Sequence, residues 1–391
     1  MRRTAVSLLA FFALLLAVAP ATAQTFPTDD PVLRAIWTEG MDNSQAYELA
    51  QVLSDSIGPR LYGSPQAEGA NHWAVSKFQS WGIDARNEEY GTWRGWRRGI
   101  THVDLISPWV RTLEAMMLSW SPGTNGTVET ELAVLPEFSN PADLQSWLPN
   151  ARGKFVLISM PQATCRPDAN WQEYATDESL EAMLQERGLA QDAWERSMEV
   201  VGGESAVIDG LESAGALGVF RFRWPGNWGH QNISTAPTQS IPAIGLGCED
   251  YGLLYRLVSN NQGPVVRVHA DAEALGDVPV FNTIAEIRGS ELPDEYIVLS
   301  AHLDSWDGGT GATDNTTGSV IMMETARVLK TVFPNPKRTI IVGLWGGEER
   351  GLIGSRAFSE DHAEVVEGLQ AVFNQDNGTG RVVRVSMQGL T

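Results

Sequence analysis

The sequence is poor in cysteine, in positive charge and, beyond its first residues, in long apolar segments. Its 391 residues include only two cysteines, Cys165 and Cys248, which are too few for a cysteine-rich zinc site. The same pair is compatible with a disulfide or with two isolated buried thiols, and the sequence favours neither. Lysine and arginine total 28 against 48 acidic residues, giving a formal net charge of -20. This balance argues against a nucleic-acid partner, because phosphate binding needs clustered cations.

The first residues have the pattern of an export signal. Arg2 and Arg3 precede a short apolar run at residues 5–19, and Ala21-Thr22-Ala23 supplies small residues for cleavage. We therefore predict a signal peptide over residues 1–23 and a secreted or periplasmic protein, with a twin-arginine route left open. No later segment is apolar over a membrane-spanning length, so no membrane contact is expected after cleavage.

The composition of the whole chain is typical of a globular α/β protein, with 43% hydrophobic residues, 38 glycines and 20 prolines. Residues 24–115 are predicted to hold helices, one of them over 69–81, and an edge strand. Residues 116–277 alternate short strands with turns around one helix (205–216), which indicates an inserted β-rich domain. Residues 278–391 follow a βαβα rhythm. Buried strands are predicted there at 296–300, 339–345 and 369–373, and helices at 318–331 and 355–363.

Acidic residues and one histidine follow these three buried strands. His302 comes after the first strand, Glu348 and Glu349 after the second, and Asp376 after the third. In open α/β sheets, ligands bind beyond the carboxyl ends of the strands, so these side chains are expected to meet at one edge. Gathered carboxylates raise one another's pKa unless a cation lies between them. Mixed nitrogen and oxygen ligands favour zinc.

Two further aspartates belong to this pattern. Asp304, two residues after His302, is placed to accept the second ring N–H of the imidazole and so fix its tautomer. Asp314 lies in a Gly- and Thr-rich loop before a helix, where its carboxylate could bridge two metals. Taken singly, Asp304 is also explained by an Asx turn and Asp314 by helix capping. The ordered set is far more specific than any one member.

This ordered set resembles the M28 family of zinc peptidases, and residues 281–289 and 301–307 are similar to one branch of it. The resemblance implies a three-layer α/β/α zinc-exopeptidase fold with a mixed, mainly parallel central sheet. It also implies that residues 116–277 are a protease-associated domain inserted in a peptidase domain formed by 24–115 and 278–391. Carried over by position, His302 and Asp376 would hold one zinc, Asp314 would bridge, Glu349 would hold a second zinc and Glu348 would be the general base.

The family also uses a later histidine on the second zinc, and no histidine follows Asp376 here. His362, in a predicted helix after the glutamate pair, is a poor substitute. We therefore expect a chain that is incomplete at its C-terminus. This fragment should lack activity, whereas the complete enzyme would bind two zinc ions.

The resulting expectation is an exported exopeptidase that hydrolyses dipeptides or short peptides, with a homodimer possible. Whether it acts at the amino or the carboxyl end stays open, as do side-chain preference and oligomeric state. Two alternatives remain: a non-catalytic, receptor-like binding module of the same fold, and an acyltransferase similar to glutaminyl cyclases.

Overall fold

The computed structural model describes residues 27–228 and 234–387, and the chain divides into two units, residues 1–44 and 45–391. In the first unit, helix α1 (Pro31–Trp37) begins after Asp30, whose side chain accepts hydrogen bonds from the first backbone N–H groups. A π-helical turn, η1 (Thr38–Asp42), follows. The predicted signal peptide, residues 1–23, lies outside the described residues. Within the described ranges, no helix is both long and apolar enough to cross a membrane.

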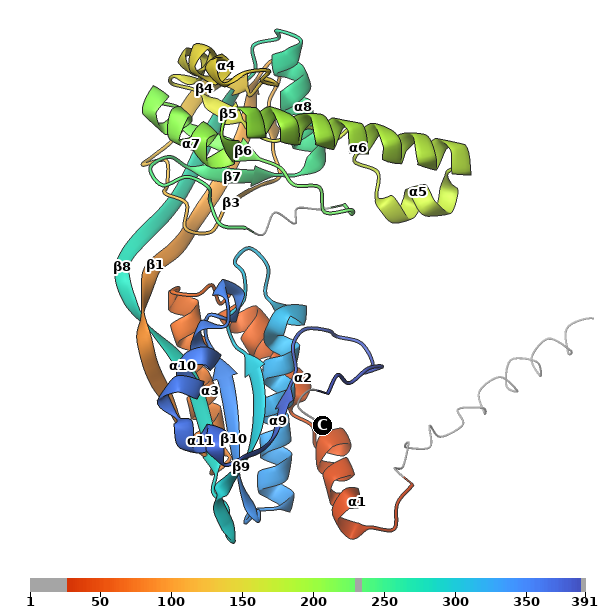
Figure 1. The fold of residues 1–391 in the computed structure, drawn as a ribbon, viewed down its shortest axis with the longest axis vertical. Helices are drawn as coiled ribbons and strands as arrows, with labels where there is room; N and C mark the ends of the chain where they lie inside the picture. The colour runs from red at the N-terminus through yellow and green to blue at the C-terminus, as the bar shows by residue number, and fades with distance from the viewer. Residues whose placement is uncertain (1–26, 229–233, 388–391) are drawn as a thin grey trace, which may run out of the picture. The chain divides into compact units, whose positions relative to one another are not determined.

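The sheet that carries the candidate site runs in the order β11-β9-β10-β8-β1 (Figure 1). Its strands β9 (Leu292–His302), β10 (Arg338–Trp345) and β11 (Leu369–Asn374) are parallel to one another. Strand β8 (Val265–Ile287) is antiparallel to β10, and β1 (Asp84–Ser107) is antiparallel to β8. The three strands predicted in this region are confirmed. Because they are parallel, the loops that follow them emerge at the same edge of the sheet.

Helices cover both faces of this sheet. Neighbouring strand residues alternate between the two faces: Leu299 packs in one buried cluster and Val298 in the other. The first cluster includes residues of α2 (Ala46–Gln51), η2 (Val52–Ile57), α3 (Pro65–Ser80) and α9 (Thr317–Val332). The second includes residues of α10 (Ile353–Asp361) and α11 (Ala363–Glu367). The predicted mixed α/β fold is confirmed.

Helix α3 shows how local sequence sets these elements. The Ser64 side chain accepts a hydrogen bond from the Ala67 N–H, and Pro65 occupies the first turn, where its missing N–H costs nothing. Its apolar residues recur at helical spacing, and Ala70, Ala74 and Phe78 are fully buried. The helix predicted over 69–81 is thus confirmed, and the cap at Ser64 makes it begin earlier.

Strands β1 and β8 continue past this sheet as a two-stranded ribbon to a second group of strands (Figure 1). There β8 pairs with β4 (Val128–Val134), followed in order by β5 (Phe155–Leu157), β6 (Gly218–Arg221), β7 (Ala243–Leu246) and β3 (Ala115–Met117). A short strand, β2 (Arg111–Thr112), pairs with β1. The helices of this region are α4 (Pro141–Trp147), η3 (Leu148–Ala151), α5 (Asp168–Tyr174), α6 (Asp177–Val200), α7 (Gly203–Ala214) and α8 (Cys248–Ser259). Two hydrophobic clusters hold it together, and one of them also includes Leu61, which precedes α3.

Helix α6, 24 residues long, lies in the region predicted to be β-rich and is not predicted by the sequence pattern. A search for apolar residues at helical spacing misses this helix, because charged residues are spread around it and its only buried residues are Met183 and Ser197. Its stability comes from helix-forming residues and from Thr176, whose side chain accepts from the Ser179 N–H.

The prediction that β11 is covered on both faces is wrong. Val372 is 51% exposed and Phe373 is 58% exposed. The reason is position: β11 is the outermost strand of the sheet order, paired only with β9, and within the described ranges its side chains enter none of the buried clusters.

The two cysteines form a disulfide between Cys165 and Cys248, which resolves the choice that the sequence left open. The bond joins the loop before α5 to the first residue of α8, across 83 positions of sequence. Closing a loop of this length restricts the unfolded chain, and the chain-entropy model puts the stabilisation at roughly 4 to 5 kcal/mol.

We therefore expect the Cys165→Ala/Cys248→Ala variant to unfold at lower urea concentration, with the loss of stability confined to the region between β1 and β8. Tryptophan fluorescence during urea titration measures this, and zinc binding at the site predicted around His302 should not change. A reductant should destabilise the natural protein and leave the variant unaffected. An unchanged unfolding midpoint after reduction would contradict the stabilising role.

Candidate metal centre

Three neighbouring strands deliver the central side chains of the site. His302 is the last residue of β9, Glu348 follows β10, and Asp376 lies two residues beyond β11. Asp314 comes from the turn η4 (Ala312–Thr316), which leads into α9. The parallel register of β9 with both neighbours is what brings these four positions to one edge of the sheet.

The side chains converge on the Nε2 atom of His302. This atom lies 3.0 Å from Oδ1 of Asp314, 3.2 Å from Oδ1 of Asp376 and 3.9 Å from Oε2 of Glu348. Possible ligand atoms of His302, Asp314 and Asp376 all lie within 4.8 Å of one another. One imidazole nitrogen and two carboxylate oxygens at this spacing suit a single zinc ion.

The Nδ1 side of the His302 ring faces Asp304. The closest acceptor is the backbone carbonyl oxygen of Asp304, 2.9 Å away, whereas its carboxylate Oδ1 is at 3.5 Å. A proton on Nδ1 then leaves the Nε2 lone pair directed at the carboxylates, which is the form that binds metal. The buried Asp304 carboxylate instead accepts the backbone N–H groups of Glu348 at 3.1 Å and Glu349 at 3.3 Å. Asp304 therefore contacts both the histidine and the glutamate pair.

The glutamate pair sits on a 3-10 turn, η5 (Glu348–Arg350), which two glycines introduce. A Cβ at Gly346 would lie 2.7 Å from both the Phe281 carbonyl oxygen and the Tyr90 hydroxyl, so a side chain cannot fit there. Gly347 has a φ of 70°, a conformation that favours glycine. This pair of glycines lets the chain turn sharply at the end of β10 and present both acids.

The electrostatics of the site require a cation. Burial, together with the charges of Asp314 and Asp304, raises the pKa of Glu349 to about 7. Burial and nearby carboxylates also raise the pKa of Glu348, against the opposing effect of His302. One buried oxygen of Glu349, Oε1, has no hydrogen-bond partner among the described residues. A dication would stabilise the charged carboxylates and satisfy that oxygen, so the residues present fit a metal.

Burial and the same carboxylates also shift the pKa of His302. Burial lowers its pKa, but the hydrogen bond and charge of Asp304 and the charges of Glu348 and Asp376 outweigh it and raise the pKa of His302 to about 9. Without metal the ring is therefore protonated at neutral pH. A metal must displace that proton to bind, so metal affinity and proton release are coupled at this position.

Sequence reasoning missed one residue that shapes the site. Arg60 is fully buried, and its guanidinium donates to the carbonyl oxygens of Leu303 at 2.7 Å, Gly58 at 2.9 Å and Thr310 at 3.0 Å. It thus ties down the loop between His302 and Asp314. Nothing in the local sequence around Arg60 shows that its side chain points inward.

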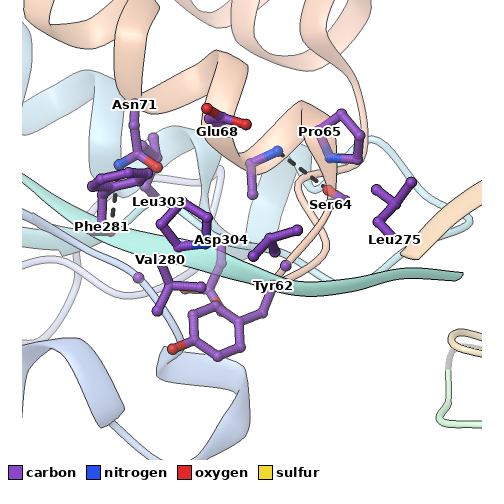
Figure 2. A pocket seen from close by; sticks show the side chains of 15 residues that line it. Tyr62, Ser64, Pro65, Glu68, Asn71, Leu275, Val280, Phe281, Leu303 and Asp304 are labelled. Carbon is purple, nitrogen blue, oxygen red and sulfur yellow. Dashed lines mark hydrogen bonds between the residues drawn. The ribbon is translucent and has the colours of Figure 1, made fainter. Parts of the chain in front are cut away.

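Two cavities adjoin the site. Asp304 and Leu303 form part of the wall of a small one, about 50 Å³, together with residues of β8 and the start of α3 (Figure 2). A larger cavity of about 360 Å³ is lined by His302, Glu348 and Asp376 and continues along apolar side chains of β11, α10 and α11. The larger cavity offers room for an organic ligand beside the proposed metal position.

The structure places His362 away from this cluster. Its Nε2 lies 3.0 Å from Glu88 and its Nδ1 3.2 Å from Glu364, at the end of α10. It is thus engaged in ion pairs of its own rather than directed at Glu349.

Comparison with known proteins agrees with this geometry. Residues 282–387, which include every residue of the cluster, match the family model for peptidase family M28. The chain belongs to peptidase family M28. It is 30% identical over 341 residues to carboxypeptidase Q of Rattus norvegicus, covering 87% of this chain and 66% of that protein's length. Carboxypeptidase Q of Homo sapiens is 28% identical over 344 residues, with the same shares of the two chains.

Solved structures of M28 peptidases share the fold. An M28 peptidase precursor from Shewanella amazonensis superposes with a TM-score of 0.58 at 25% identity, over 88% of this chain and 73% of that one. A zinc aminopeptidase from Bacillus subtilis has a TM-score of 0.51 at 21% identity, over 85% of this chain and 68% of that one. The order of the elements around the site is therefore that of M28 peptidases.

We expect His302→Ala and Asp314→Asn each to weaken zinc binding by at least about 100-fold, since each removes a direct ligand and loss of an outer contact alone commonly costs 10- to 100-fold. Isothermal titration with zinc on the full chain measures this. His362→Ala is the matched control and should bind zinc normally. Equal affinity in all three variants would show that the metal binds elsewhere.

Proposed function

We propose that this chain is a zinc-dependent exopeptidase that hydrolyses dipeptides or short peptides. The observation that carries the proposal is the meeting of His302, Asp314 and Asp376 within 4.8 Å, beside Glu348. The relatives support it, since one is a carboxypeptidase and another, similar in fold, is a zinc aminopeptidase. The family resemblance supports the substrate class.

We infer the following roles for the ligands. His302 and Asp376 would hold one zinc, Asp314 would be shared with a second, and Glu349 would hold that second ion. The charge of Asp314 raises the pKa of the buried Glu349 carboxyl, so the two acids are close enough to share a cation. Zinc would polarise the scissile carbonyl and lower the pKa of a water molecule.

Glu348 is proposed as the general base. Its backbone N–H is fixed by Asp304, and its carboxylate stands 3.9 Å from His302 Nε2, at the edge of the larger cavity. As the water oxygen attacks the carbonyl carbon, Glu348 accepts the water proton. It returns a proton to the leaving nitrogen as the C–N bond breaks, so that the products are an acid and an amine. Asp304 orients His302 and keeps Glu348 in place.

We also propose where the protein is located and what kind of domain the insert is. A disulfide in a protein with a predicted signal peptide supports export to an oxidising compartment, outside the cell or in the periplasm. We infer that the region between β1 and β8 is a protease-associated domain, as its short strands and the sequence resemblance suggest. Its long ribbon connection to the peptidase sheet would allow it to border the substrate site.

We expect Glu348→Gln to lower kcat for dipeptide hydrolysis by about 100- to 10,000-fold, the usual contribution of a general base, with zinc binding retained. Steady-state kinetics and zinc titration on the same preparation measure the two effects. Glu364→Gln, an exposed acid on α11, is the control and should retain activity.

The outcomes separate the candidate functions. Full activity in Glu348→Gln would exclude this residue as the base. Zinc binding without hydrolysis of any dipeptide by the complete enzyme would favour a non-catalytic binding module, and formation of pyroglutamate from glutaminyl peptides would favour an acyltransferase.

A further inference from the structure

A cluster of two tryptophans and two arginines lies directly after the glutamate pair. The guanidinium carbon of Arg350 is 5.1 Å from the ring centre of Trp306 and 5.1 Å from that of Trp120. The two indole rings contact each other edge to face, with ring centres 6.5 Å apart. On the other side, the guanidinium carbon of Arg94 is 4.8 Å from the ring centre of Trp120. We call these four residues the Arg–Trp cluster.

Both arginines of the cluster lack an acidic partner in the part of the chain that the structure describes. Among the described residues, neither Arg94 nor Arg350 forms an ion pair with a carboxylate, although the chain carries 20 more negative than positive charges. By contrast, Arg98 on the same strand as Arg94 pairs with the buried Asp307. Burial and the charge of Arg350 both lower the pKa of Arg94. Two cations that share one aromatic ring and repel each other form a site for an anion.

The cluster adjoins the proposed metal centre. Arg350 is the residue after Glu349, and Trp306 lies close enough to the Glu349 carboxyl to lower its pKa. Arg350 also donates to the Thr235 hydroxyl at 3.2 Å, which holds its fork in one orientation. An anion bound by the two guanidinium groups would therefore sit near the place where a peptide is hydrolysed.

We propose that Arg350 and Arg94 bind the free C-terminal carboxylate of a short peptide substrate. This inference rests on the proposed peptidase function and extends it to substrate selection. In a dipeptide the terminal carboxylate lies on the leaving amino acid, only a few bonds from the scissile carbonyl, so a cation site beside the metal ligands can reach it. Guanidinium groups match a carboxylate with two parallel hydrogen bonds, and the flanking indoles limit competition from water. A long peptide would place its terminus elsewhere, so the cluster favours short substrates.

The test compares a dipeptide with its C-terminal amide, which removes only the negative charge. For the natural chain loaded with zinc, we expect alanyl-alanine to have a KM about 10- to 100-fold lower than alanyl-alanine amide, as charged hydrogen bonds typically give. The Arg94→Gln/Arg350→Gln variant should raise the KM of the acid to that of the amide and change the amide little. Arg97→Gln is the matched control, since Arg97 is an exposed arginine of β1 paired with Glu273.

A binding measurement keeps this test independent of turnover. Titrating both ligands into the Glu348→Gln background should show the same preference for the acid, and removing both arginines should abolish it. Equal affinity for acid and amide in the chain with both arginines would overturn the proposal. The proposal would also be overturned if the double variant lost the same affinity for the acid and for the amide and unfolded at a lower temperature. That result would assign the cluster a purely structural role. Arginine-dependent preference in binding without hydrolysis of any dipeptide would support the carboxylate site and count against the peptidase function.

Discussion

The mutual repulsion of carboxylates around one buried imidazole is the constraint on which the rest of this structure depends. Asp304, Asp314, Glu348, Glu349 and Asp376 all act on His302 or on one another, and the pKa values of both glutamates rise as a result. An uncompensated cluster of this kind would destabilise the fold. The chain holds it with directed backbone N–H groups, with parallel strands that fix the spacing, and with a position for a cation at the centre.

The surrounding elements serve that arrangement. Glycine at 346 and 347 lets the chain turn where Phe281 and Tyr90 leave no room for a side chain. Arg60 holds the loop between two proposed ligands by donating to its carbonyl oxygens from inside the protein. His302 and Asp314 are therefore held in part by Arg60, which is fully buried. Ligands held in fixed positions give a metal ion a defined coordination geometry, which charge attraction alone does not provide.

The sequence predicted the elements that show a simple pattern of apolar residues. Apolar runs identified β9 and β10, and the acids after each run identified the edge where they meet. It could not predict Arg60 or the Arg–Trp cluster, because Arg94, Trp120 and Arg350 are brought together only by folding over long sequence distances. Helix α6 escaped notice because a largely solvated helix has no apolar stripe. The exposure of β11 depends on its place at the edge of the sheet, which apolar content does not reveal. The pairing of Cys165 with Cys248 depends on distance in space and not on spacing in sequence.

The ribbon of β1 and β8 has a consequence for synthesis of the protein. Asp84 pairs with Glu286 and Ser107 with Val265, so the two strands meet only after the whole intervening region has left the ribosome. At the usual elongation rates of about 5–20 residues per second, β1 waits several seconds or more for its partner. During this interval the region that follows β1 can form one of its two hydrophobic clusters, which lies within residues 118–243. The other cluster includes residues of β8, so it must wait for β8, as must the sheet that bears His302. The order of translation thus favours completing the insert before the metal-binding edge, and pairing over so long a separation makes closure of the ribbon a slow folding step.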